Sequence, residues 1–225
     1  MKTVAEIISD QLSIQTSSGI KRFRYEPYDM EIALNVISRI GKGLDENFNI
    51  EPVRDFYIEL IKYFHGDDTF KGDLSKGILI QGPCGTGKTL AMRIMKIYQT
   101  IDNIKFALNG HIYYMNYDVV NVNDIINGFM VNAYDGIQVY CNRYVVCLDD
   151  IGTESEEVKY YGNNLDVISH VISERYLKRL LTFATTNFSM DAIEDKYSDR
   201  ISSRMYAMFN FLLLKSRDFR KPTKQ

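Results

Sequence analysis

The stretch Gly82-Pro83-Cys84-Gly85-Thr86-Gly87-Lys88-Thr89 decides the fold, because it has the G-x-x-x-x-G-K-[ST] spacing of a phosphate-binding P-loop. Its glycines let the chain curl until backbone N–H groups surround a phosphate. Lys88 can reach the β- and γ-phosphates of a nucleoside triphosphate, and the Thr89 hydroxyl can bind Mg²⁺. The motif predicts that ATP and Mg²⁺ bind at Gly82, Pro83, Cys84, Gly85, Thr86, Gly87, Lys88, Thr89 and Leu90.

The residues on either side of this loop have the character that a P-loop requires. Ile78-Leu79-Ile80 is a short apolar run, as a buried parallel strand would be, and helix-forming residues follow over 90–95. A phosphate at the N-terminus of such a helix is stabilised by free N–H groups and by the helix dipole. The alternative is a chance glycine turn before a helix, which leaves the strand, the lysine and the threonine unexplained.

Composition indicates a soluble, globular and reduced protein. With 225 residues, of which 45% are hydrophobic and 25% charged, the chain can form one core and a small additional segment. Its net charge of −2 gives no general attraction to nucleic acid. No apolar run approaches the roughly 20 residues of a membrane span, no signal peptide is apparent, and the cysteines form no C-x-x-C motif. We therefore expect a cytoplasmic protein without membrane association or a zinc site.

The chain changes character near Lys76. Before this residue, apolar residues at helical spacing predict helices over 32–40 and 53–64. After it, short apolar strands alternate with helical stretches. The strands are predicted at 78–81, 111–115, 144–149, 181–186 and 209–214, and the helices at about 88–99, 118–131, 164–179 and 197–207. This alternation indicates a parallel sheet covered by helices on both faces, with the nucleotide at the C-terminal edge of the strands.

An apolar strand that ends in two carboxylates follows the P-loop, as a Walker B element does. The run 144–148 leads directly into Asp149 and Asp150. A carboxylate at a strand tip can hold Mg²⁺, and its neighbour can position and deprotonate the attacking water. We therefore predict Asp149 as a metal ligand and Asp150 as the catalytic base. The alternative is an acidic turn, because further acids follow at Glu154, Glu156 and Glu157.

Two further groups could contact the γ-phosphate. Asn187 follows another apolar strand, and its amide could bind the phosphate or the attacking water; alternatively, it caps the segment that follows. Arg200 and Arg204 lie four residues apart, so they share a helical face, and a guanidinium can stabilise charge on the γ-phosphate. The alternative is that these arginines form surface salt bridges with Asp195 or Asp199.

Together these motifs resemble those of AAA+ ATPases, specifically the DnaC/IstB-like helicase-loader group. The resemblance extends over about residues 49–221. It rests on the residues that enter the P-loop, on Walker B, on sensor 1 and on the segment with the arginine finger, which are 76–83, 148–154, 185–187 and 199–205. It implies a five-stranded sheet in the order 5-1-4-3-2. It also implies an ATPase domain over 49–225, preceded by a mostly helical segment over 1–48 that could bind a partner.

The resemblance assigns catalysis to Lys88, Asp150, Asn187 and Arg204, with Arg200 as the alternative finger. It implies slow ATP hydrolysis that a partner or DNA stimulates, in a homo-oligomer assembled head to tail. No C-terminal lid domain is expected, because only eleven residues follow Leu214.

The implied role is that of an ATP-driven loader of a replicative helicase, and three alternatives stay open. They are an IstB-like transposition helper, a small-metabolite P-loop kinase and a nucleotide-gated binding module. The region before the P-loop has no cysteine cluster, unlike members with a zinc-binding helicase-interacting domain.

The C-terminal tail is the basic segment that could contact single-stranded DNA. It has one acid, Asp218, and an aromatic residue, Phe219, which could stack on a base. Its cations are Lys215, Arg217, Arg220, Lys221 and Lys224. The alternatives are that the tail is a frayed, solvated end or that Arg217 or Arg220 contacts the nucleotide.

Overall fold

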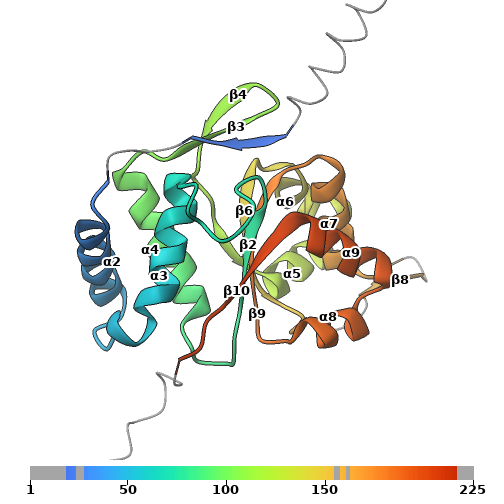
Figure 1. Ribbon diagram of the computed structural model, residues 1–225. Coiled ribbons are helices and arrows are strands. Elements are labelled where there is room, and N and C mark those ends of the chain that lie inside the picture. The colour runs from blue at the N-terminus through green and yellow to red at the C-terminus, as the bar shows by residue number, and fades with distance from the viewer. Residues whose placement is uncertain (1–18, 24–27, 155–157, 161–162, 217–225) are drawn as a thin grey trace, which may run out of the picture.

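A parallel sheet of five strands, in the order β10-β2-β9-β6-β5, lies at the centre of the molecule (Figure 1). The structure is a computed structural model, and it describes residues 19–23, 28–154, 158–160 and 163–216. The strands are β2 (Gly77–Gln81), β5 (Val119–Asn121), β6 (Val145–Ile151), β9 (Leu181–Thr186) and β10 (Phe209–Leu213). Counted along the chain, this order is 5-1-4-3-2, which confirms the predicted fold class and strand order.

Continuous apolar runs place three of these strands in the middle of the sheet. Strand β9 is buried along its whole length, and β2 and β6 are buried at all but one position each. Alternate residues face opposite layers, so that Ile78 and Ile80 belong to one hydrophobic core and Leu79 to the other. Burial on both faces is what a parallel sheet between two helical layers requires.

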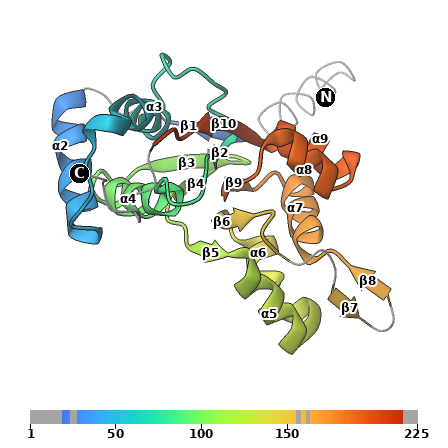
Figure 2. The same ribbon diagram turned by 90° about the horizontal axis from the view of Figure 1, so that it is seen from below.

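Helices cover both faces of this sheet (Figures 1 and 2). One layer consists of α2 (Met30–Leu44), α3 (Arg54–His65) and α4 (Lys88–Ile101), with the short 3-10 helix η1 (Glu51–Val53) before α3. The other consists of α5 (Val122–Asn132), η2 (Ala133–Gly136), α6 (Gln138–Asn142), α7 (Val167–Leu177), α8 (Met190–Lys196) and α9 (Asp199–Met208). None of the helices that the structure describes has the length and apolar character needed to cross a membrane.

The two helices predicted before the P-loop are confirmed. Helix α3 ends at Gly66, whose φ of 63° is the left-handed conformation that favours glycine. Helix α2 continues past residue 40, where the predicted helix ends, and extends to Leu44. Gly41 lies under the ring of Phe48, which would come within 2.2 Å of a Cβ atom at that position. Gly41 therefore allows Phe48 to pack closely against α2 and does not end the helix. The domain division at residues 48 and 49 stays a prediction.

The second strand of the central sheet was predicted at the wrong place. Residues His111–Tyr114 form β4, which pairs antiparallel with β3 (Lys105–Leu108) in a separate sheet that also contains β1 (Ile20–Arg22). The turn between β3 and β4 is Asn109-Gly110, and both residues have positive φ, as a two-residue hairpin turn requires. The strand that takes the predicted place in the central sheet is β5. It lies within 118–131, where we expected a helix.

The second half also differs from the prediction in one helix boundary and in elements that were not predicted. Helix α7 begins at Val167, three residues later than expected, because the Asp166 side chain caps it by accepting a hydrogen bond from the Ser169 N–H. Just before it, β7 (Val158–Tyr160) pairs antiparallel with β8 (Asn163–Leu165). Helix α8 was not predicted; Ser189 caps it.

Candidate nucleotide-binding site

The P-loop joins β2 to α4 and has a backbone that only glycine adopts without strain. Gly85 and Gly87 have φ values of 80° and 91°. At Gly82, a Cβ atom would lie 2.5 Å from the carbonyl oxygen of Leu214. Helix α4 begins at Lys88, and no side chain caps its first turn. Its N-terminal N–H groups are therefore available to an anion, as the sequence predicted.

Lys88 extends its ammonium group back over the loop. Its side chain is almost fully buried, and Nζ donates to the carbonyl oxygens of Gly82 and Pro83, each at 2.8 Å. It also donates to Oδ1 of Asn187 at 2.5 Å. These contacts hold a positive charge at the C-terminal edge of the sheet, beside the loop.

Asn187 lies between Lys88 and the Walker B carboxylates. Its Nδ2 is 3.5 Å from Oδ1 of Asp150, while its oxygen accepts the hydrogen bond from Lys88. The hydroxyl of Ser189, not the Asn187 side chain, accepts the hydrogen bond that caps α8. The capping alternative for Asn187 is therefore wrong, and its amide lies where it can orient a group between Lys88 and Asp150.

Asp149 is a buried carboxylate that two threonine hydroxyls hold in place. Its Oδ1 accepts hydrogen bonds from Thr89 at 2.9 Å and from Thr185 at 2.7 Å. Burial raises the pKa of the Asp149 carboxyl, the two threonine hydrogen bonds oppose the rise, and the nearby Asp150 adds to it. A hydroxyl and a carboxylate at this separation are hard oxygen donors, which fit Mg²⁺.

A bulge in β6 turns both consecutive aspartates toward the same cleft. Successive side chains of a regular strand point to opposite faces, but the pairing of β6 with β9 shifts register between Leu148 and Ile151. Asp150 has a φ of 63°, and its N–H donates to the Thr185 hydroxyl at 2.9 Å. A non-glycine residue in this conformation costs roughly 1–3 kcal/mol, and such strain is concentrated at functional sites.

The predicted residues of the P-loop, β6 and β9 meet at one cleft of about 400 Å³. Those that line it are Cys84, Gly85, Gly87, Lys88, Thr89, Leu90, Asp149, Asp150 and Asn187. The other predicted loop residues, Gly82, Pro83 and Thr86, shape the loop behind it, where Thr86 Oγ1 donates to the Pro83 carbonyl at 2.9 Å. Asp45 and Arg93 also line the cleft, although no sequence motif indicated them. Arg93 lies one helical turn after Thr89 and could have been expected on the same face.

The two arginines of α9 do not line this cleft. Arg200 is exposed, whereas Arg204 is 9% exposed and its guanidinium carbon lies 5.3 Å from the centre of the Tyr176 ring. Among the described residues, neither arginine forms the salt bridge with Asp195 or Asp199 that was the alternative. Arg204 is therefore held by an aromatic face, outside the cleft of its own chain.

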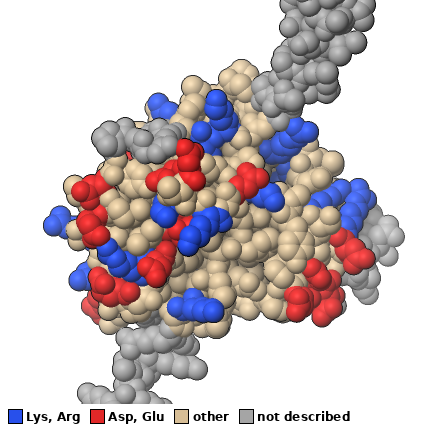
Figure 3. Space-filling view, viewed as in Figure 1, with Lys and Arg blue, Asp and Glu red and all other residues tan. Residues whose placement is uncertain are grey.

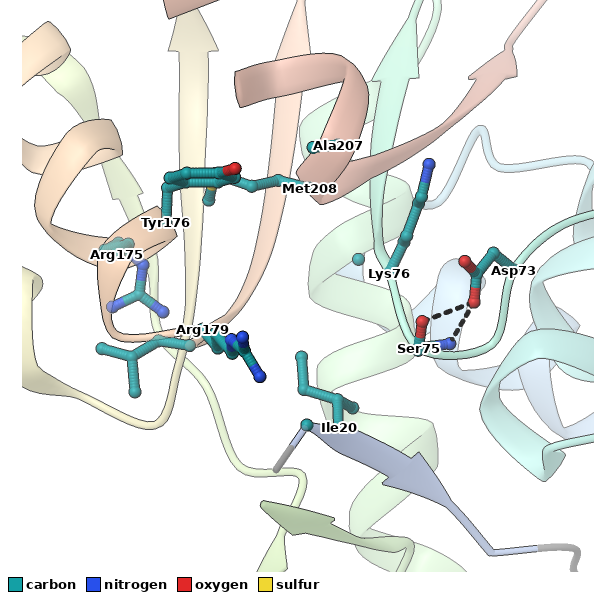
Figure 4. Close-up of a pocket in the computed structure, with 12 residues that line it drawn as sticks. Ile20, Asp73, Ser75, Lys76, Arg175, Tyr176, Arg179, Ala207 and Met208 are labelled. Carbon is teal, nitrogen blue, oxygen red and sulfur yellow. Dashed lines mark hydrogen bonds between the residues drawn. The ribbon is translucent and has the colours of Figure 1, made fainter. Parts of the chain in front are cut away.

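A second cavity, of about 450 Å³, lies at the N-terminal edge of the sheet, near Gly77 (Figure 4). Its wall includes Tyr176 and Arg175, and Arg175 is fully buried. Arg175 donates to the carbonyl oxygens of Tyr140, Arg143 and Leu181 and to the Thr182 hydroxyl. Burial lowers the pKa of Arg175 to about 9. Because backbone carbonyls engage this guanidinium, we assign it a structural role.

The chain returns to the P-loop after β10. The Leu214 N–H donates to the Gln81 carbonyl at 2.8 Å, and the Ser216 hydroxyl donates to the Thr86 carbonyl at 3.3 Å. The predicted DNA-binding tail therefore starts beside the nucleotide cleft. Lys215 is exposed, and the remaining cations of the tail lie outside the described residues.

Comparison of this structure with solved structures confirms the AAA+ type of fold. The DnaC helicase loader matches with a TM-score of 0.51 and 22% identity, over 75% of this chain and 92% of that one. DnaI matches with a TM-score of 0.54 and 17% identity, over 88% and 96% of the two chains. AMPPCP-bound DnaA from Aquifex aeolicus matches with a TM-score of 0.53 and 17% identity, over 78% of this chain and 50% of its own.

The similarity of this protein to known proteins was found by comparing structures. No protein-family model matches the sequence. No curated protein matches it either. The solved structures that share its fold include the DnaC helicase loader and DnaI.

Proposed function

We propose that this protein binds and hydrolyses ATP in the cleft between the P-loop and the ends of β6 and β9. The observation that carries the proposal is that Lys88, Thr89, Asp149, Asp150 and Asn187 line one cleft, although they come from three separate segments. Together they provide the cation, hydroxyl, carboxylates and amide that phosphoryl transfer uses. The same fold in AMPPCP-bound DnaA supports a triphosphate as the ligand.

Thr89 and Asp149 would hold Mg²⁺, because their oxygen atoms lie 2.9 Å apart at the cleft. The bound ion supplies positive charge that stabilises the charge developing on the phosphates. Lys88 binds the β- and γ-phosphates in exchange for part of its contact with the loop carbonyls. Asp150 accepts the proton of the attacking water, and the Asn187 amide beside it orients that water.

The site is completed by a neighbouring subunit. Arg204 does not line its own cleft, yet its guanidinium forms no salt bridge among the described residues. An arginine in this position can act on the γ-phosphate of another protomer. A contact of this kind joins two different surfaces, so it builds a ring or an open spiral. We therefore propose a cytoplasmic homo-oligomer in which each Arg204 serves the next active site, with Arg200 as its exposed neighbour.

We infer that the ATPase loads a replicative helicase. The fold is shared with the DnaC helicase loader and DnaI over most of the length of each chain. A transposition helper, a small-metabolite kinase and a nucleotide-gated binding module would use the same cleft. These alternatives differ from a loader in what stimulates hydrolysis.

The test is ATP hydrolysis by the purified protein, alone and with the replicative helicase of its host. We expect slow hydrolysis, stimulated by the helicase, and transfer of the helicase onto single-stranded DNA that depends on ATP. Stimulation by a transposase alone would assign the protein as a transposition helper. Phosphate transfer to a small metabolite would make it a kinase, and tight ATP binding without any turnover would make it a binding module.

A further inference from the structure

Two hollows adjoin the nucleotide cleft along the edge strand β5, and the farther one is lined by tyrosines. Arg93 lines both the cleft and an adjoining hollow of about 610 Å³. Asp118 and Arg143 line both that hollow and a further pocket of about 530 Å³. Figure 2 shows β5 between α4 and α6, with the β3–β4 hairpin nearby. We call the hollow and the pocket together the edge groove.

The edge groove has an excess of positive charge, although the whole chain has a net charge of −2. Its cations are Arg93, Lys96 and Arg143, and Asp118 is the one acid among the described residues that line it. Asp118 accepts hydrogen bonds from Lys96, at 2.9 Å, and from Arg143, and these bonds lower its pKa. Figure 3, which views the molecule from the same side as Figure 1, shows cations and anions interspersed on that face.

Aromatic rings lie at the far end of the groove. The rings of Tyr113 and Tyr144 are 3.8 Å apart, and Tyr144 is 49% exposed. Tyr114 is 59% exposed, and Lys105 lies over its ring at 4.7 Å. The amide residues Asn116 and Asn142 line the same pocket and could bind the edge of a base. Cations that follow a groove toward exposed aromatic rings are the surface that single-stranded nucleic acids use, because phosphates pair with the cations and bases stack on the rings.

We propose that the edge groove binds single-stranded DNA. Phosphates lie along Arg93, Lys96 and Arg143, and a base stacks on Tyr144. The choice of DNA as the nucleic acid rests on the proposed function, whereas the site rests on the groove itself. This site differs from the C-terminal tail, and it places the DNA next to the nucleotide, with Arg93 facing both ligands.

The test measures the binding of a fluorescent oligothymidylate to the full chain by anisotropy. Tyr144→Ala should weaken binding about tenfold, because loss of one stacking contact has an effect of this order. Tyr144→Phe keeps the ring and should bind within about twofold of the parent. The matched control is Tyr206→Ala, which removes a similarly exposed tyrosine from α9 at the other edge of the sheet and should bind like the parent. Lys96→Ala should reduce the dependence of binding on salt concentration, because Lys96 is one of the cations placed along the phosphates.

Binding of Tyr144→Ala equal to that of the parent would overturn the proposal, as would tighter binding of an RNA of equivalent sequence. If truncation after Leu214 abolished DNA binding and Tyr144→Ala did not, the DNA site would be the C-terminal tail instead. Should Tyr144→Ala also lose ATP binding, a photoreactive thymidine analogue is cross-linked to the parent protein. Cross-links within 111–118 or 138–145 support the site, and cross-links confined to other segments contradict it. ATP hydrolysis without DNA is measured in parallel, so a failure of the ATPase proposal is recognised separately.

Discussion

Replacing Lys88 with alanine should weaken ATP binding about 100-fold or more. The Lys88 ammonium is the one lysine group that lines the cleft among the described residues. Each charge-assisted hydrogen bond that it makes to a phosphate contributes about 1.5–3 kcal/mol, and two such bonds are expected. Part of this gain is offset, because Lys88 must release hydrogen bonds to Gly82, Pro83 or Asn187. A net loss of about 3 kcal/mol corresponds to a factor above 100 in the dissociation constant.

The assay is isothermal titration calorimetry with ATP and with ADP. ADP should lose less affinity than ATP, because it lacks the γ-phosphate that Lys88 also contacts. The control is Lys96→Ala, which removes another lysine of α4, one paired with Asp118 at the surface. It should leave ATP affinity within about twofold of the parent. If Lys88→Ala bound ATP as tightly as this control, Lys88 would not bind the phosphates and the reasoning would be refuted.

Three further predictions concern the other residues of the cleft. Asp150→Asn keeps the size of the side chain and removes the base, so ATP should still bind while turnover falls by about 100-fold or more in a phosphate-release assay; unchanged turnover would make Asp150 structural. Burial raises the pKa of Asp149 in the folded protein, so its carboxylate destabilises the fold at neutral pH and less so as the pH falls toward that pKa. Asp149→Asn should therefore raise the melting temperature at neutral pH, by more than at acidic pH, and weaken binding of the Mg²⁺–ATP complex; a lower melting temperature at neutral pH would contradict this. Asn187→Ala should lower turnover more than ATP affinity, and equal losses in both would show that the amide only supports Lys88.

Local sequence predicted the parts of the site that lie on contiguous motifs. The P-loop spacing fixes which groups approach a phosphate, and an apolar strand ending in carboxylates places Asp149 and Asp150 at the edge of the sheet. The bulge that turns both aspartates into one cleft depends on pairing with β9, so the sequence did not indicate it. Asp45 and Arg93 reach the cleft through the packing of α2 and α4, which motif spacing does not describe.

The errors in the predicted fold arise where apolar patterning alone does not determine which strands pair. Strand β4 is apolar enough to pass for a strand of the central sheet, but the Asn109-Gly110 turn pairs it with β3. The true strand, β5, has only three residues, too few for a periodicity to be recognised. Local sequence also left two roles open for Asn187, contact with the phosphate or the attacking water and capping of the segment that follows. The contact between Asn187 and Lys88 decides between them, and it joins residues far apart in the sequence.

The most direct test of a shared active site is to mix two inactive variants and measure ATP hydrolysis. Lys88→Ala subunits retain Arg204, and Arg204→Ala subunits retain the whole cleft, so some interfaces in a mixed oligomer contain one intact site. We predict that each variant alone hydrolyses ATP at a small fraction of the parent rate and that mixing restores part of the activity. No recovery on mixing, together with a specific activity independent of protein concentration, would contradict a site completed by the neighbouring subunit.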